Sequence, residues 1–246
     1  MHKFYVTTLD QKPHLEKQID LISEQAWPEF LLHGDSKNWH NLFDIFAKYQ
    51  ILFLDGPEKV AAVGHTVPLT WDGTKADLPE TNDLIIQRAI LSYDRKQSPN
   101  TFSAMAAMVD PEYRKQGLSE AILTEMRKLA LHYGAGCLIA PVRPITKEKY
   151  LQIPFDDYVN KRREDGTALD PWIRVHERLG AKIAGTIPRG LTVTGTIEEW
   201  QKWTHRRFKK SGDYEIPGAL DWVHIDIEHD KGVYYDPNVW MVHKIG

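Results

Sequence analysis

The sequence predicts a mixed α/β (α+β) fold, and three observations lead to this prediction. Segments with strand character and segments with helical periodicity follow one another along the whole chain. The 246 residues are 42% apolar, which is enough to bury a large core. The segment 101–109 is apolar on both of its strand faces, as expected of a central strand in a sheet. We expect a single domain over residues 1–246, in which residues 195–246 form a C-terminal extension.

The first half of the chain gives strand and helix signals in a clear order. A helix from Pro13 follows the first strand and is ended by Pro28, because proline cannot continue a helix. Two apolar runs flank Asp55-Gly56-Pro57, which is a turn sequence, and together they predict a hairpin. The elements expected in this half are strand 4–9, helix 13–27, helix 36–49, strands 51–54 and 60–69, helix 83–95 and strand 101–109.

Capping residues and glycines mark the elements of the second half. Gly134 and Gly136 end the helix that begins near Leu118, and Asp170-Pro171 is a strong helix start. Pro188-Arg-Gly190 is expected to interrupt the strand signal over 182–193. The remaining elements are strand 137–142, helix 155–162, helix 170–180, helix 196–203 and a hairpin of 222–228 with 233–235.

Composition and charge exclude several classes of protein. A net charge of −3 and a pI near 6.4 argue against a nucleic-acid binder. The single cysteine, Cys137, excludes an internal disulfide and a CxxC metal site. With no signal-peptide pattern and no apolar run of about 18 residues, we expect a soluble cytoplasmic protein without a membrane partner. His224, Asp226 and Glu228 fit the polar face of a hairpin better than a metal site, so no metal is expected.

The loop from Asp110 to Ser119 is suited to hold an anion. It connects strand 101–109 to an amphipathic helix whose apolar residues recur every three to four positions. The first amides of a helix have no intrahelical acceptor, and the helix dipole adds partial positive charge, so several donors can bind a diphosphate there. Gly117 lets the backbone approach such a ligand closely. The residues expected to hold it are Arg114, Lys115, Gln116, Gly117, Leu118 and Ser119.

Arg114-Lys-Gln-Gly117-Leu-Ser119 resembles the coenzyme A signature of the GCN5-related N-acetyltransferases, which is Arg or Gln, two residues, Gly, one residue, then Gly or Ala. Val109-Asp-Pro111-Glu-Tyr113 matches the residues that usually precede it, whereas Ser119 departs from it by a small hydroxyl side chain. The resemblance implies a twisted, mostly antiparallel sheet that splays at its central strands, with helices on both faces. It also implies acetyl-CoA as co-substrate and a backbone amide near Met108 or Val109 that meets the oxyanion.

A second motif, Asp170-Pro-Trp-Ile-Arg-Val-His-Glu-Arg-Leu-Gly180-Ala181, resembles a later helix of the same family. In the family a Tyr of this helix usually protonates the leaving thiolate, and counting back from Gly180 places His176 at its position. Ala181 replaces the usual Phe. Since imidazolium is a stronger acid than phenol, His176 could act as acid or base at neutral pH. The alternative is a surface or core histidine with no catalytic role.

Residues 140–243 are also similar to the acyltransferase-like loading domains of some bacterial polyketide synthases. Those domains act on acyl-CoA thioesters with a Thr, a His and a Trp in the pocket. By motif the Thr corresponds to Thr146 and the His to His176, and we take Trp27, at the end of the first helix, as the candidate for the Trp. Arg143, in an insertion after strand 137–142, is a further candidate for substrate contact. The structural alternatives are a solvated loop for the insertion and a helix-end anchor for Trp27.

These resemblances favour an acyl-CoA-dependent acyltransferase that moves acetyl from acetyl-CoA to an amine by direct attack. One alternative is malonyl-CoA decarboxylation or S-acyl transfer to a carrier-protein thiol. The other is a coenzyme A-binding module without catalysis. The expected acceptor is accordingly a small-molecule amine or an acyl-carrier protein, and the sequence does not specify an oligomeric state.

Overall fold

The computed structural model describes residues 3–245, and the chain divides into two compact units. The first unit comprises Met1–Trp27, Lys37–Ala140 and Val242–Gly246, and the second comprises Pro28–Ser36 and Pro141–Met241. Across the described residues, no helix is both long and apolar enough to cross a bilayer. The single domain with an extension from residue 195 stays a prediction.

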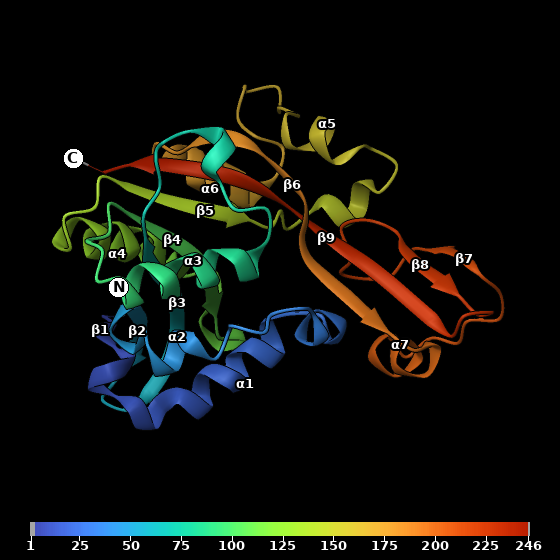
Figure 1. Ribbon diagram of the computed structural model, residues 1–246, viewed down its shortest axis with the longest axis horizontal. Helices are drawn as coiled ribbons and strands as arrows, with labels where there is room; N and C mark the ends of the chain where they lie inside the picture. Colours follow the sequence, from blue (N-terminus) through green and yellow to red (C-terminus); the bar gives the residue numbers. More distant parts are fainter. Residues whose placement is uncertain (1–2, 246) are drawn as a thin grey trace. The chain divides into compact units, whose positions relative to one another are not determined.

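The first unit is built on strands that pair in chain order (Figure 1). Strands β1 to β4 are antiparallel to their neighbours, and β5 then lies parallel to β4. The strands are β1 (Tyr5–Thr8), β2 (Gln50–Asp55), β3 (Lys59–Leu69), β4 (Thr101–Val109) and β5 (Cys137–Val142), of which the last two residues belong to the second unit. The helices are α1 (Glu16–Ala26), α2 (Asn41–Asp44), α3 (Asn82–Asp94) and α4 (Leu118–His132).

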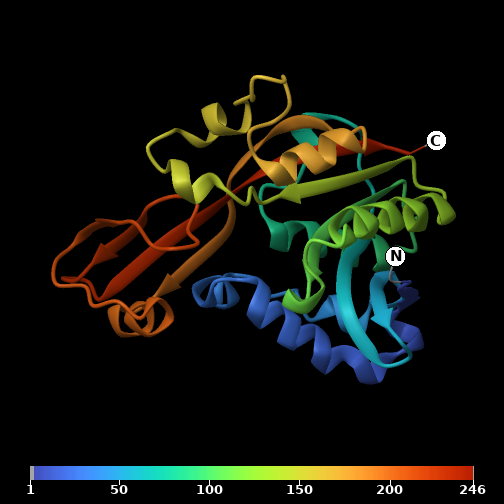
Figure 2. The same ribbon diagram turned by 180° about the vertical axis from the view of Figure 1, so that it is seen from behind.

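Helices cover both faces of this sheet, as predicted (Figures 1 and 2). On β3, Val63 belongs to the same apolar cluster as Ile19 and Ile22 of α1. The next residue, Gly64, faces α4, and a Cβ built on it would stand 2.6 Å from Ile122. Successive residues of a strand point to opposite faces, so α1 and α4 lie on opposite sides of the sheet.

Strands β4 and β5 separate soon after they begin. Their parallel register runs from Thr101 opposite Cys137 to Ser103 opposite Ile139. Although β4 extends to Val109, no later pair with β5 occurs among the described residues. This is the split between central strands that the family resemblance implies. Backbone amides on this edge of β4 are therefore available to a ligand.

The second unit is organised around β9 (Lys231–Lys244), whose last residues, from Val242 on, belong to the first unit. In Figure 1, β8 and α7 lie at the end of β9 that is far from the C-terminus. Trp200 of α7 is fully buried and stacks on Phe30 with ring centroids 5.7 Å apart. β6 and β8 pair with β9, and β7 pairs with β8. The other elements are α5 (Phe155–Val159), α6 (Pro171–Arg178), β6 (Lys182–Gly195), α7 (Ile197–Thr204), β7 (Gly212–Tyr214) and β8 (Val223–Asp226).

The strand expected over 233–235 is much longer in the structure, where β9 runs over Lys231–Lys244. Two further predicted elements differ for identifiable reasons. The helix expected over 36–49 shrinks to α2 and a 3₁₀ turn, because Asn38 gives its backbone and side-chain N–H groups to Asp83, both at 2.8 Å. β6 runs through Pro188-Arg-Gly190 without the expected interruption. A Cβ on Gly190 would lie 2.4 Å from the side-chain oxygen of Asn238, so this glycine admits a neighbouring side chain and does not form a turn.

Candidate active site

The loop after β4 is held by short local hydrogen bonds. Asp110 accepts the Glu112 amide through its carboxylate at 2.8 Å and so starts a 3₁₀ turn over Pro111–Tyr113. Tyr113 is buried and donates its hydroxyl to Asp55 at 2.7 Å, and burial raises the pKa of this hydroxyl above its ordinary value. The loop is therefore anchored to β2 just before the segment that is expected to bind the coenzyme.

The segment from Arg114 to Ser119 ends as an uncapped helix N-terminus. Gly117 has φ +80° and no side chain to cap α4, and the first bond across the helix start joins the Ala121 amide to the Gly117 carbonyl at 3.1 Å. The amides of Leu118 and Ser119 precede this bond and have no intrahelical acceptor. They form a donor set for an anion, strengthened by the dipole of the 15-residue helix.

The basic residues Arg114 and Lys115 and the glycine Gly117 differ in backbone conformation and contacts. Lys115 takes φ +64°, an uncommon conformation for a residue with a side chain, and Arg114 donates to the Gln25 carbonyl at 3.4 Å. Lys115 and Gln116 are exposed. Nothing lies within 4 Å of a Cβ built on Gly117. In the chain itself, this glycine is therefore required by its positive φ and not by a neighbouring side chain.

The strand geometry distinguishes between the two amides proposed for the oxyanion. The Asp110 amide donates to the Ala61 carbonyl of β3 at 3.0 Å. Amides alternate between the two edges of a strand, so the Met108 amide also points to β3 and the Val109 amide points to the opposite edge. That opposite edge is the one along the split from β5, which makes Val109 the better placed donor.

Trp27 and Met108 are brought together in the first unit. The Trp27 indole N–H donates to the Met108 sulfur at 3.1 Å. Trp27 is half-buried and packs on the apolar cluster of α1, together with Trp39 and Phe43. These two rings meet His65 of β3, and none of these three residues was among the predicted site residues. A histidine within the otherwise apolar strand signal over 60–69 was the only available indication in the sequence.

In the second unit, Arg143 lies in a nearly buried ion pair. Its Nε donates to both carboxylate oxygens of Asp236, at 2.9 and 3.0 Å, and its Nη2 donates to the Gly218 carbonyl at 2.6 Å. Asp236 also accepts the Tyr234 hydroxyl at 2.6 Å. These bonds tie the insertion that carries Arg143 to the tail around Gly218 and Asp236.

Thr146 belongs to a hydrogen-bond cluster centred on the buried Asp170. One carboxylate oxygen of Asp170 accepts the Thr146 amide at 3.0 Å, the Thr146 hydroxyl at 3.1 Å and the Tyr158 hydroxyl at 2.9 Å. The other oxygen caps α6 by accepting the amides of Trp172 and Ile173. The Thr146 hydroxyl also lies 2.7 Å from that of Tyr158. Asp170 therefore fixes the insertion and the start of α6 together.

His176 lies on α6, the helix that Asp170 caps. Its side chain is 1% exposed, and its ring packs edge-to-face on Trp172 with centroids 4.6 Å apart. The structure therefore excludes the helix-surface alternative for His176. A buried position remains compatible with both a core role and a catalytic one.

No group of three or more histidine, cysteine, aspartate or glutamate side chains that could hold a metal is found in residues 3–245. On the second-unit hairpin, His224 contacts Asp213 at 2.9 Å, and Asp226 contacts His229 at 2.7 Å. These residues pair with neighbours, as a polar hairpin face would.

Comparison with known proteins gives the family. No protein-family model matches the chain. The arginine N-acetyltransferase AvaD of Aspergillus versicolor is 31% identical, over 89% of this chain and 85% of that protein. The chain belongs to the GCN5-related N-acetyltransferase superfamily. It is an acyl-CoA-dependent acyltransferase of the class that acetylates amines.

Solved structures confirm the fold of this GCN5-related N-acetyltransferase. The GNAT-like loading domain of CurA from Lyngbya majuscula is 16% identical and has a TM-score of 0.61, with 98% of each chain covered. The GphF GNAT-like decarboxylase in complex with isobutyryl-CoA is 14% identical and has a TM-score of 0.58, with 99% of each chain covered. At these identities the similarity concerns the fold alone.

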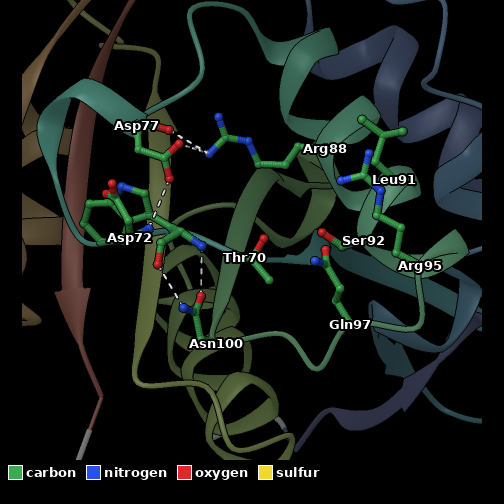
Figure 3. Close-up of a pocket in the computed structure, with 10 residues that line it drawn as sticks. Thr70, Asp72, Asp77, Arg88, Leu91, Ser92, Arg95, Gln97 and Asn100 are labelled. Atoms are coloured by element: carbon green, nitrogen blue, oxygen red, sulfur yellow. Dashed lines mark hydrogen bonds and ion pairs between the residues drawn. The ribbon is translucent and has the colours of Figure 1, made fainter.

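A cavity of about 550 Å³ lies in the first unit of this acetyltransferase, next to the start of β4 (Figure 3). The loop from Asp110 to Ser119 follows the other end of that strand. Within the cavity, Arg88 pairs with Asp77 at 3.1 Å, and the Asn100 amide bonds both backbone groups of Trp71 at 2.9 Å. These polar groups already form hydrogen bonds or ion pairs with one another. The cavity is therefore a weaker candidate for a charged ligand than the uncapped end of α4.

Proposed function

We propose that this acetyltransferase transfers the acetyl group of acetyl-CoA to a nitrogen of free arginine. The observation that carries the proposal is the 31% identity to an arginine N-acetyltransferase over 89% of the chain. At this coverage the match extends into both compact units. Arginine is small and cationic, so the acceptor side must tolerate a positive charge.

The coenzyme diphosphate is assigned to the helix N-terminus of α4. The amides of Leu118 and Ser119 would bind its oxygens, and the side chains of Arg114 and Lys115 would add positive charge. The Val109 amide would donate to the oxyanion that forms when the nitrogen attacks the thioester. The open backbone edge of β4 and the uncapped start of α4 support this assignment.

His176 is assigned as the group that protonates the leaving thiolate. The assignment comes from its place four residues before Gly180, where the family has a Tyr, and its burial on the capped helix α6 is consistent with a fixed orientation. We expect His176→Phe to lower turnover by about 10² or more while the affinity for coenzyme A changes little. Steady-state kinetics with parallel calorimetry measure both quantities. Normal turnover would leave His176 with a packing role only.

Thr146, Arg143 and Trp27 are assigned supporting roles. The Thr146 hydroxyl and the remaining Arg143 donors could contact acyl or acceptor groups, while their bonds to Asp170 and Asp236 fix their positions. Trp27 is assigned to the acceptor side because it contacts Met108, the neighbour of Val109.

An acceptor panel tests the proposed function. The protein is incubated with acetyl-CoA and arginine, agmatine or lysine, and thiol release is followed together with acyl-CoA masses. Arginine-dependent release of free thiol is the expected result. A parallel reaction with malonyl-CoA, with and without a carrier protein, tests the alternative. Conversion of malonyl-CoA to acetyl-CoA without any amine, and no release with the amines, would overturn the proposal.

A further inference from the structure

The tautomer of one buried histidine in the first unit is set by its neighbours. His65 on β3 has no exposed surface, and its Nδ1 lies 2.8 Å from the side-chain oxygen of Gln50. The Gln50 amide nitrogen donates to the Phe46 and Thr66 carbonyls at 2.8 and 3.0 Å, so its orientation is determined and its oxygen must accept. The proton of neutral His65 is therefore on Nδ1, and the lone pair is on Nε2.

Two buried polar atoms on this side of the sheet have no hydrogen-bond partner among the described residues. They are Nε2 of His65 and the hydroxyl of Ser103 on β4. Val67 pairs with Ser103 and lies two residues from His65 on β3, so His65 and Ser103 project from the same face. A buried polar atom without a partner costs about 1–3 kcal/mol, which favours a ligand that supplies the missing hydrogen bond.

Aromatic rings cover His65 from the side of α2. Trp39 and Phe43 meet its ring edge-to-face, with centroids 5.7 and 5.5 Å away. Both rings are half-buried, so each also reaches the surface of the protein. Trp27, which contacts Met108, packs on the same apolar cluster. An uncharged acceptor surrounded by indole and phenyl rings is a suitable environment for a cation that carries N–H donors.

We propose that His65 binds the acyl acceptor: its Nε2 accepts a hydrogen bond from an N–H of the substrate cation, between the rings of Trp39 and Phe43. This inference rests on the proposed function, since it specifies the acceptor side of the same site. Burial lowers the pKa of His65 to about 4, so the imidazole is uncharged at neutral pH and does not repel a guanidinium or ammonium group. Such a weak base positions the acceptor and does not deprotonate it.

Kinetics of two His65 variants test the inference. His65→Phe keeps a ring but removes the acceptor atom, and we expect it to raise KM for arginine about 10- to 100-fold, as for loss of a hydrogen bond to a charged group. KM for acetyl-CoA should stay within about twofold. His65→Gln restores an acceptor oxygen and should recover part of the loss. His224→Phe is the matched control, because His224 is an exposed histidine of the second unit, and it should change neither constant.

A measurement on the unmodified protein covers the case in which the variants do not fold. The ¹⁵N resonance of His65 Nε2 is followed by NMR during titration with arginine. A change in this resonance, with Nδ1 remaining protonated, is expected on binding. If arginine releases thiol but leaves Nε2 and the KM of the variants unchanged, the inference is wrong and the proposed function stands. If no amine releases thiol and no amine shifts Nε2, both fail.

Discussion

Asp170 shows how one side chain can organise a large part of a site. Its buried carboxylate accepts two amides at the start of α6 and, from the insertion, the amides of Ile145 and Thr146. The N-cap role follows from Asp170-Pro171 in the sequence. The bonds to Thr146 and Tyr158 could not be predicted, because nothing local couples residues 24 and 12 positions apart.

His65 illustrates the opposite case, in which a residue of interest carries no motif. It lies within a strand of apolar residues and was therefore indistinguishable from a core position. Only the structure shows that Gln50 fixes its tautomer and leaves Nε2 without a partner in the described part of the chain. The segment 114–119, by contrast, could be proposed for the coenzyme from the sequence because its motif is local, and this role stays a prediction.

The buried His65 predicts a pH dependence of stability. Its pKa falls from 6.5 to about 4 on folding, so the unfolded chain binds the proton more tightly. The stabilising contribution is present above pH 6.5 and is lost as the pH falls toward 4, for a total of about 3 kcal/mol. Urea unfolding at pH 7 and pH 4.5 measures it. The acid-induced loss of stability should be smaller in His65→Gln, and an equal loss in both proteins would contradict the assigned burial.

At the scale of elements, the helix α4 carries the coenzyme assignment, and its two ends offer a matched test. Gly117 at its start and Gly134 after its end have φ of +80° and +76°, and neither has a neighbour within 4 Å of a built Cβ. Alanine at either position should therefore cost a similar amount of stability, about 1 kcal/mol.

Only the N-terminal glycine should affect the ligand. We expect Gly117→Ala to weaken coenzyme A binding about tenfold or more, with a larger effect for Gly117→Val, because the new side chain occupies space next to the donor amides. Gly134→Ala should bind coenzyme A as the unmodified protein does. Calorimetry on both folded variants measures the affinities. If the Gly117 and Gly134 variants bind coenzyme A with equal affinity, the diphosphate does not bind at this end of α4.

Element boundaries were predictable where the signals were local. Thr81 caps α3 and Thr196 caps α7 close to the expected starts, and the hairpin of β2 and β3 follows its turn sequence. The continuity of β6 and the shortening of the helix at 36–49 could not be predicted. They depend on contacts with Asn238 and Asp83, which lie in distant parts of the chain. Tertiary contacts determine the bounds of these two elements.

At the scale of the whole molecule, sequence identity and fold similarity give different information. The 31% identity to an arginine N-acetyltransferase supports the reaction class, whereas the CurA and GphF structures, at 16% and 14% identity, support the fold. The sequence motifs predicted the superfamily from two short segments. They could not specify the acceptor, since charges of both signs alternate along the insertion at 147–164.

The most direct test of the central claim measures both products of the same reaction. The protein is incubated with acetyl-CoA and arginine, and free coenzyme A and acetylarginine are quantified over time by mass spectrometry. Direct acetyl transfer predicts that the two products form in equal amounts and that neither accumulates when arginine is omitted. Release of coenzyme A without acetylarginine, or equal release with and without arginine, would contradict the account.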